Sequence, residues 1–181
     1  LYLDSAVGDR ADIETDSSKL QIIPYITLMD QRSKKIFIYQ RGEGGNEERL
    51  HGMCSIGLGG HVEEETNYTR DMKSVIIECI VRELAEEVGL IFTPTEVMDL
   101  SITTSSKGYA IYDDSDAVGK VHLGVGYVMS IDKARLQSSE LDVITNGKWL
   151  SIPEIKSGVA EGIFKLENWS KLVMTGLDNS I

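Results

Sequence analysis

Two apolar stretches near the start of the chain have the pattern of a β-hairpin. Residues 20–29 and 35–39 are rich in β-branched and aromatic side chains, and a short polar turn separates them. Pro24 cannot donate a hydrogen bond to a neighbouring strand, so it indicates an edge or a bulge early in the first strand. Residues 1–19 are mostly polar and acidic, and we expect them to form a mobile leader or an edge segment.

The clearest helical pattern covers residues 74–88. Its apolar side chains fall on one arc of about 140° on a helical wheel, which predicts the buried face of the helix. Gly89 follows the pattern directly and is placed to act as the C-terminal cap. The six residues of the predicted buried face are Ile76, Ile77, Ile80, Val81, Leu84 and Val88.

The same kind of pattern predicts the other elements. Residues 42–60 are dense in glycine and predict a short strand that enters a glycine turn. We expect strands over residues 97–104 and 118–131, with the acidic loop 107–119 between them as a candidate lid. This order of elements indicates a mixed α/β layered domain. The last elements expected are a strand over 149–153, a short helix over 153–157 and a final helix over 163–173.

Three carboxylates lie close together on the C-terminal half of the helix over 74–88. Glu83 and Glu87 fall about 40° apart on the helical wheel, and Glu86 lies about 60° beyond Glu83. Like charges at this spacing destabilise a helix by about 0.2–0.5 kcal/mol per pair. A hard divalent cation takes oxygen ligands and bridges carboxylates to phosphate oxygens. The cluster therefore indicates a metal site that handles phosphate.

Length and charge narrow the range of functions. A chain of 181 residues fits one domain of ordinary size, which we place at residues 20–181. The formal charge of −11 and the lack of a basic stripe argue against binding of nucleic acid or of an anionic membrane surface. A phosphate-bearing ligand would then have to be bound together with a metal ion. Cys54 and Cys79 lack the spacing of a metal site or a disulfide framework, so we expect reduced thiols. No apolar run is long enough to span a membrane, and we expect a cytoplasmic protein.

The glycine turn and the acidic helix together resemble the signature of the Nudix hydrolases. That signature has a glycine loop before a helix that carries Arg-Glu-x-x-Glu-Glu-x-Gly. Gly59 and Gly60 supply the glycine loop here, and residues 82–89 match the helix pattern at every defined position. The resemblance implies the Nudix fold, of α/β (α+β) class, in which a mixed β-sheet is layered with helices as an α-β-α sandwich.

The glycine half of the signature departs from the family pattern. Gly60 lies 22 residues before Arg82, which is about eight residues more than the family spacing. The longer loop leaves no glutamate at the family's position between them. Glu65 is the nearest substitute, and Glu63 and Glu64 are equally available. 

The resemblance implies a metal-dependent hydrolase. Members of the family hydrolyse a nucleoside diphosphate linked to another moiety, with water attacking phosphorus and Mg²⁺ or Mn²⁺ bound. The metal ligands implied for this chain are the carboxylates of Glu83, Glu86 and Glu87, with the carbonyl of Gly59 as a neutral ligand.

The resemblance also implies the catalytic residues. Arg82 corresponds to a residue that orients the carboxylates, and Glu83, Glu86 and Glu65 are the other catalytic candidates. The choice of general base stays open, because members of the family differ in which glutamate they use. Glu78 lies on the wrong face of the helix, and we interpret it as an i,i+4 partner of Arg82.

His61 directly follows the glycine turn. With Gly60 it is a candidate for contact with the substrate phosphate, as a hydrogen-bond donor, and a structural role is equally open. For His51 and His122 we favour a structural role.

Two other functions stay open from the sequence. The interrupted signature also fits a Nudix-fold domain that binds a nucleotide or regulates a partner without hydrolysis, although three intact carboxylates favour the enzyme. A more distant alternative is an isomerase that uses acid and base residues. We expect a small nucleotide-type diphosphate as the substrate, and we leave a homodimer open.

Overall fold

A mixed sheet of six strands runs through the computed structural model, which describes residues 8–44, 48–63, 71–99, 108–137 and 144–178. The sheet has the order β3, β2, β1, β5, β4, and β6 also pairs with β2. No helix in these ranges is long and apolar enough to cross a membrane. The strands are β1 (Gln21–Asp30), β2 (Ile36–Arg41), β3 (Cys54–Ser55), β4 (Tyr109–Ile111), β5 (His122–Ile131) and β6 (Ile144–Leu150).

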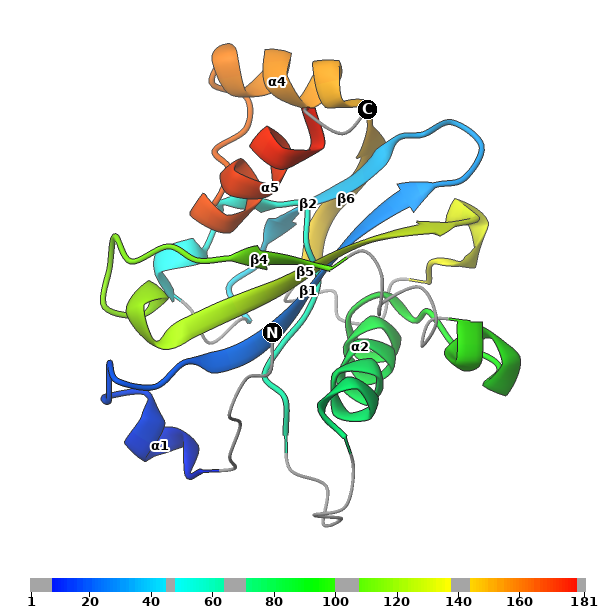
Figure 1. Cartoon of the computed structure of the whole chain (residues 1–181). Coiled ribbons are helices and arrows are strands. Elements are labelled where there is room, and N and C mark those ends of the chain that lie inside the picture. The colour runs from blue at the N-terminus through cyan, green and yellow to red at the C-terminus, as the bar shows by residue number, and fades with distance from the viewer. Residues whose placement is uncertain (1–7, 45–47, 64–70, 100–107, 138–143, 179–181) are drawn as a thin grey trace.

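Helices cover both faces of this sheet (Figure 1). α2 (Met72–Val88) lies on one face, and α4 (Ile152–Ala160) and α5 (Asn168–Asp178) lie on the other. Each face has its own cluster of buried apolar side chains, one that includes α2 and one that includes α4 and α5. The structure therefore confirms the predicted layered sandwich of α+β class.

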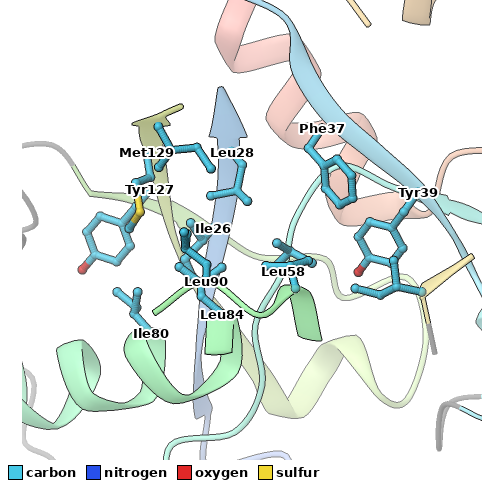
Figure 2. Close-up of a cluster of buried hydrophobic side chains, with 13 residues drawn as sticks. Ile26, Leu28, Phe37, Tyr39, Leu58, Ile80, Leu84, Leu90, Tyr127 and Met129 are labelled. Carbon is cyan, nitrogen blue, oxygen red and sulfur yellow. The ribbon is translucent and has the colours of Figure 1, made fainter. Parts of the chain in front are cut away.

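α2 matches the helix predicted over residues 74–88. Asp71 caps its first turn by accepting a hydrogen bond from the amide of Ser74, and Gly89 ends it in the left-handed conformation with φ 62°. Leu84 has no exposed surface and packs in the cluster that also holds Ile26 of β1 (Figure 2). The buried residues of the helix are Ile77, Cys79, Ile80, Leu84, Glu87 and Val88, and Ile76 and Val81 of the predicted face are half-buried.

The predicted hairpin is formed by β1 and β2, which pair antiparallel at Met29 and Ile36. β1 is an interior strand, however, because it also pairs in parallel with β5 over its whole length. The edge or bulge expected early in the strand has a local counterpart near Pro24, where Leu58 and not β2 pairs with Ile26. Pro24 is tolerated because its nitrogen faces the same side of β1 as Ile26, which bonds there to Leu58 instead of to β2. This bridge brings the glycine turn alongside β1.

The strand predicted over residues 97–104 is wrong for residues 97–99, which belong to a short helix over 94–99. Thr93 and Glu96 form a capping box: the Glu96 carboxylate accepts from the Thr93 amide, and the Thr93 hydroxyl accepts from the Glu96 amide. Pro94 occupies the first helical position, where its missing N–H costs nothing. Residues 100–104 lie outside the described part of the chain.

Other boundaries also differ from the predictions. The loop predicted over 107–119 contains β4, and residues 119–121 form a short 3₁₀-helix before β5. The strand near 149 begins at Ile144, and α5 begins at Asn168, five residues after the predicted start of the final helix. Residues 10–13 of the polar leader form the single-turn helix α1, which has no buried side chain.

Candidate functional site

A cavity of about 340 Å³ opens beside the glycine turn, between residues of α2 and residues at the start of α5. It is lined by residues of α1, β1, β2, α2, β5 and α5, by the glycine turn after β3, and by the segments before β3, β5 and α5. Its described lining consists of Arg10, Ile23, Tyr25, Arg41, Arg49, Leu50, Gly57, Gly59, Gly60, His61, Glu63, Glu83, Asp113, Asp116, Val118, Gly119, His122, Glu167, Asn168 and Trp169.

Two glycines fix the shape of the cavity floor. A Cβ at Gly59 would lie 1.9 Å from the backbone oxygen of Pro24, so only glycine allows the turn to pass so close to β1. A Cβ at Gly60 would lie 2.5 Å from a carboxylate oxygen of Glu83. The absence of side chains at these two positions lets the carboxylate of α2 rest directly against the turn.

The acidic helix contacts the glycine turn through two of its three predicted ligands. The Gly59 amide donates to Oε2 of the buried Glu87 at 3.1 Å, and Glu83 lies against Gly60. Burial raises the pKa of the Glu83 carboxyl above its usual range; the negative charge of Glu86 adds to this effect and Arg82 opposes it. Glu86 is exposed on the same stretch of the helix.

Arg82 connects the helix to the turn. Its guanidinium donates to Glu83 at 2.7 Å, to Glu63 at 3.0 Å and to the carbonyl of His61 at 2.8 Å. These contacts are the ones expected of a residue that orients the carboxylates. Glu65, the predicted substitute for the missing glutamate, and its neighbour Glu64 lie outside the described residues.

The donors of α2 and the glycine turn fit a hard divalent cation in their chemistry, although only Glu83 and Gly59 of them line the cavity. Glu83, Glu86 and Glu87 offer carboxylate oxygens and Gly59 offers a carbonyl, which are the ligand types that Mg²⁺ and Mn²⁺ prefer. Among the described residues, however, no three His, Cys, Asp or Glu side chains stand close enough together to hold a metal ion. The carboxylates would have to turn toward one another when an ion binds.

His61 and His122 meet in the cavity wall, with their Nε2 atoms 3.1 Å apart. Nδ1 of His122 lies 2.7 Å from the Val118 carbonyl and donates to it, so in the neutral ring Nε2 of His122 is the acceptor for His61. Burial lowers the pKa of His61 to about 4, which keeps the ring neutral. The sequence favoured a structural role for His122, but the pairing of β1 with β5 brings it into the cavity, whereas His51 is not among the lining residues.

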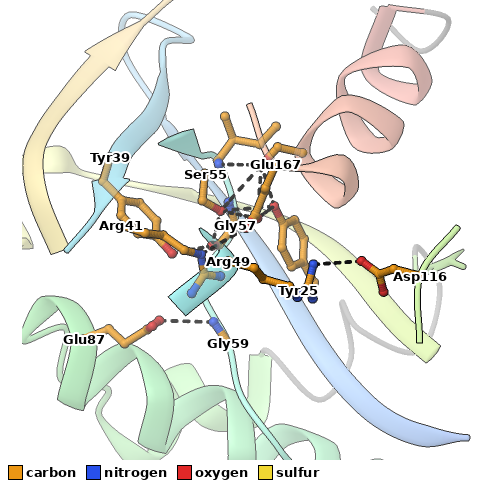
Figure 3. A network of polar contacts seen from close by, with 12 residues as sticks. Tyr25, Tyr39, Arg41, Arg49, Ser55, Gly57, Gly59, Glu87, Asp116 and Glu167 are labelled. Atoms are coloured by element: carbon orange, nitrogen blue, oxygen red, sulfur yellow. Dashed lines mark hydrogen bonds and ion pairs between the residues drawn. The ribbon is translucent and has the colours of Figure 1, made fainter. Parts of the chain in front are cut away.

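A buried polar network forms the wall opposite α2 (Figure 3). Glu167, only 4% exposed, lies just before α5, and its Oε2 accepts from Nε of Arg41 at 3.0 Å. Its other oxygen accepts from the hydroxyls of Tyr25 and Ser55, at 2.9 and 2.6 Å. Sequence reasoning missed this wall, because Glu167 and Arg41 are 126 residues apart and neither belongs to a motif.

The loop before β5 closes another side of the cavity. Asp116 pairs with Arg49 at 3.0 Å, and Asp113 accepts from the side chain of Asn168 at 2.9 Å. These contacts tie part of the predicted lid, residues 113–119, to segments on either side of the cavity. This part of the loop therefore forms a wall of the site.

The fold, with a glycine turn held against an acidic helix, is the fold of the Nudix hydrolases. The chain belongs to the family of YmaB of Bacillus subtilis strain 168: the two are 33% identical over 174 residues, which cover 93% of this chain and 76% of YmaB. No family profile matches the chain.

Solved structures show the same fold at lower identity. Tm1382, a protein assigned to the Nudix hydrolases, superposes with a TM-score of 0.70 and 23% identity, covering 96% of this chain and 79% of Tm1382. A bifunctional NMN adenylyltransferase/ADP ribose pyrophosphatase from Francisella tularensis, solved with AMP and a manganese ion, has a TM-score of 0.57 and 17% identity. That match covers 88% of this chain and 42% of the bifunctional protein.

Proposed function

We propose that this protein hydrolyses a pyrophosphate bond in a nucleoside diphosphate linked to a second moiety, with Mg²⁺ or Mn²⁺ bound. The observation that carries the proposal is the contact of α2 with the glycine turn. Glu83 lines the cavity and rests against Gly60, and Glu87 accepts from the amide of Gly59, so two acidic side chains of α2 are held against the glycine turn that lines the cavity. The raised pKa of Glu83 reflects a buried negative charge that a bound cation would offset.

Glu83, Glu86 and Glu87 would hold the metal ion, together with the carbonyl of Gly59. The bound ion would neutralise charge on the pyrophosphate and lower the pKa of the attacking water. In the reaction a water oxygen forms a bond to one phosphorus, and the bond from that phosphorus to the bridging oxygen breaks. The water proton passes to a carboxylate base, and the second phosphate leaves with the bridging oxygen.

Other residues of the chain hold this arrangement in place. Arg82 orients Glu83 through the ion pair at 2.7 Å. Gly60 and His61 are the proposed substrate contacts in the cavity lining. Gly60 also leaves room for the Glu83 carboxylate, and His61 is held in place by its contact with His122. Glu65 is the proposed further carboxylate, with Glu63 and Glu64 as alternatives in the same segment.

Relatives suggest where to look for the substrate. The bifunctional protein from Francisella tularensis is named as an ADP ribose pyrophosphatase and was solved with AMP, a nucleoside monophosphate. A nucleoside diphosphate linked to a sugar is therefore the first class to test. We place the activity in one domain over residues 20–181, acting in the cytoplasm on a small molecule and not on nucleic acid or membranes.

The experiment measures release of nucleoside monophosphate with Mg²⁺ or Mn²⁺ present. The panel contains ADP-ribose, a sugar nucleotide, a dinucleoside polyphosphate, a coenzyme and a nucleoside triphosphate. We expect wild type to cleave at least one compound and Glu86→Gln to lose at least ~100-fold in rate, the scale of a lost electrostatic element in a catalytic site. Glu78→Gln, also exposed on α2, is the matched control and should keep its activity.

A second function has one observation in its favour. The 22-residue spacing from Gly60 to Arg82 leaves no glutamate at the family's position between them, which fits a domain that binds a nucleotide without hydrolysis. Binding of panel compounds with no release from any of them would support this function. Equal rates for wild type and Glu86→Gln would overturn the metal assignment.

A further inference from the structure

Arg41 presents a cation to the cavity from the wall opposite α2. It is the last residue of β2, its side chain is 24% exposed, and it donates from Nε to Glu167 at 3.0 Å. Among the described residues, no group accepts from its two terminal nitrogens, Nη1 and Nη2. Two parallel N–H donors of an arginine match the geometry of a phosphate.

Glu167 holds this guanidinium in one place. Its Oε1 accepts from Tyr25 and Ser55, with Ser170 at 3.3 Å, and its Oε2 accepts from Arg41. Both oxygens are therefore occupied, so Glu167 is not placed to take a proton from water. Its role in this geometry is to fix the direction of Arg41.

The other two arginines of the described lining are held differently. Arg10 pairs with Glu14 and Arg49 pairs with Asp116, and these carboxylates are 44% and 39% exposed. Exposed pairs of this kind contribute little and rearrange easily. The side chain of Glu167, the partner of Arg41, is only 5% exposed and lies in a network of hydroxyl groups. The direction of Arg41 is thus set by a buried partner.

Arg41 also lies on the side of the cavity where Glu87 and Gly59, two of the proposed metal ligands, meet. Figure 3 shows its guanidinium between Glu167 on one side and the hydrogen bond of Glu87 to Gly59 on the other. A diphosphate whose oxygens reach the floor at Gly59 would lie within range of the terminal nitrogens of Arg41. The lining also contains several carboxylates, which would repel an anionic diphosphate. A positively charged group at this position would offset that repulsion.

We propose that Arg41 binds a phosphate group of the diphosphate directly through Nη1 and Nη2, and that Glu167 is the residue that positions it. This inference rests on the proposed function, since it assumes that the cavity takes a diphosphate. In this role Arg41 is a substrate-binding residue. The site should then bind diphosphates more tightly than monophosphates, because the second phosphate gains a partner whose position is fixed.

The test is calorimetric binding of ADP and AMP to the full chain. Arg41→Lys keeps the charge but loses the two-nitrogen face, so we expect ADP to bind about 10-fold or more weakly, with a smaller change for AMP. Glu167→Gln should also weaken ADP binding, because it leaves Arg41 unfixed. Arg32→Lys, at an exposed pair with Asp132, is the matched control and should bind as wild type does. Thermal unfolding of each variant checks that it is folded.

The outcomes separate the two proposals. If wild type hydrolyses a panel compound but Arg41→Lys binds ADP normally, the inference about Arg41 is overturned and the function stands. If wild type cleaves nothing but ADP binding depends on Arg41, the hydrolase is overturned and the binding role stands. Wild type that fails to bind ADP at all would also overturn the role of Arg41. If Arg41 binds the phosphate, Arg41→Lys should raise KM by a larger factor than it lowers kcat in a hydrolysis assay.

Discussion

At the scale of single residues, Gly60 determines where the Glu83 carboxylate can lie. A methyl group at position 60 would overlap the carboxylate oxygens, which belong to the flexible end of a side chain. Gly60→Ala should therefore displace Glu83 at little cost in stability. We expect about a 100-fold loss of hydrolysis, the effect of misplacing a catalytic group by about 1 Å, with a nearly unchanged melting temperature.

The control for this substitution is Gly176→Ala in α5. A Cβ at Gly176 meets no atom within 4 Å, so this variant should keep full activity. Alanine is also the better helix former, so the control should melt at the same temperature or higher. Full activity of Gly60→Ala would show that the position of Glu83 does not matter for the reaction.

Asp30 gives a prediction on pH. It is buried at the end of β1, and hydrogen bonds from the side chain and the amide of Ser33 lower its pKa to about 2 from an ordinary 3.8. Because the folded pKa is the lower one, this carboxylate stabilises the fold above about pH 3.8 and loses that contribution as the pH falls toward 2. Asp30→Asn should therefore be less stable than wild type at pH 6, with the difference shrinking between pH 4 and pH 2.

Equilibrium unfolding of both proteins from pH 2 to pH 6 measures this difference. A difference in unfolding free energy that stays constant, or that grows as the pH falls, would contradict the assignment. The measurement does not depend on the proposed activity, because Asp30 lies outside the cavity lining.

The site could be predicted from the sequence only where it follows a local motif. Glu83, Glu86, Glu87 and Gly59 belong to two short segments, and their residue types and spacing indicate a metal and a phosphate. Tertiary pairing brings the remaining side chains to the cavity: β1 beside β5 places His122 there, and α5 packing on the sheet places Glu167. No spacing along the chain carries that information.

At the scale of secondary structure, the C-terminus of α2 depends on Gly89. Its φ of 62° is left-handed, and a Cβ there would lie 2.7 Å from the backbone oxygen of Gln137. The Gln137 amide in turn donates to the carbonyl of Val88. Gly89→Ala should lower the free energy of unfolding by more than the ~1–2 kcal/mol of left-handed strain alone, because the Gln137 backbone would also have to move.

Gly162 provides the matched control in chemical denaturation. Its φ is also left-handed, at 76°, but a Cβ there meets nothing within 4 Å. Gly162→Ala should therefore show the strain without the overlap and cost less than Gly89→Ala. Equal losses of unfolding free energy for the two variants would mean that the backbone of Gln137 moves at no measurable cost.

Elements with strong periodicity were predicted well, and weak or short ones were not. The hairpin and α2 follow from apolar patterns that tertiary packing reinforces. The helix over 94–99 differs from the predicted strand because it begins at a capping box, Thr93 to Glu96, which the apolar pattern alone does not reveal. β4 has only three residues, and it forms because β5 offers it a partner along the sheet. Such an element has no pattern of its own to detect.

At the scale of the whole molecule, the protein combines a net charge of −11 with a proposed function on anionic substrates. Diffusional attraction cannot explain binding of such a substrate, since like charges repel. The structure concentrates the means of overcoming this repulsion in one cavity. The acidic floor at α2 would recruit a divalent cation, and Arg41 on the opposite wall supplies a fixed positive charge.

The layered fold places the metal side of the cavity and the Arg41 side on different elements. The floor is carried by α2 on one face of the sheet, and the wall with Glu167 is carried by the segment before α5 on the other. β1 and the glycine turn pass between them and connect both. Changes to the metal side should therefore affect the chemical step, and changes to the Arg41 side should affect binding of the diphosphate.

The most direct test of the central claim follows the oxygen atom of the attacking water. The panel compound that wild type cleaves fastest is incubated with Mn²⁺ in ¹⁸O-labelled water, and the products are analysed by mass spectrometry. The account predicts one ¹⁸O atom in the phosphate group that was attacked, and at least ~100-fold less labelled product with Glu86→Gln. No cleavage of any compound, unlabelled products, or equal labelling by the two proteins would contradict it.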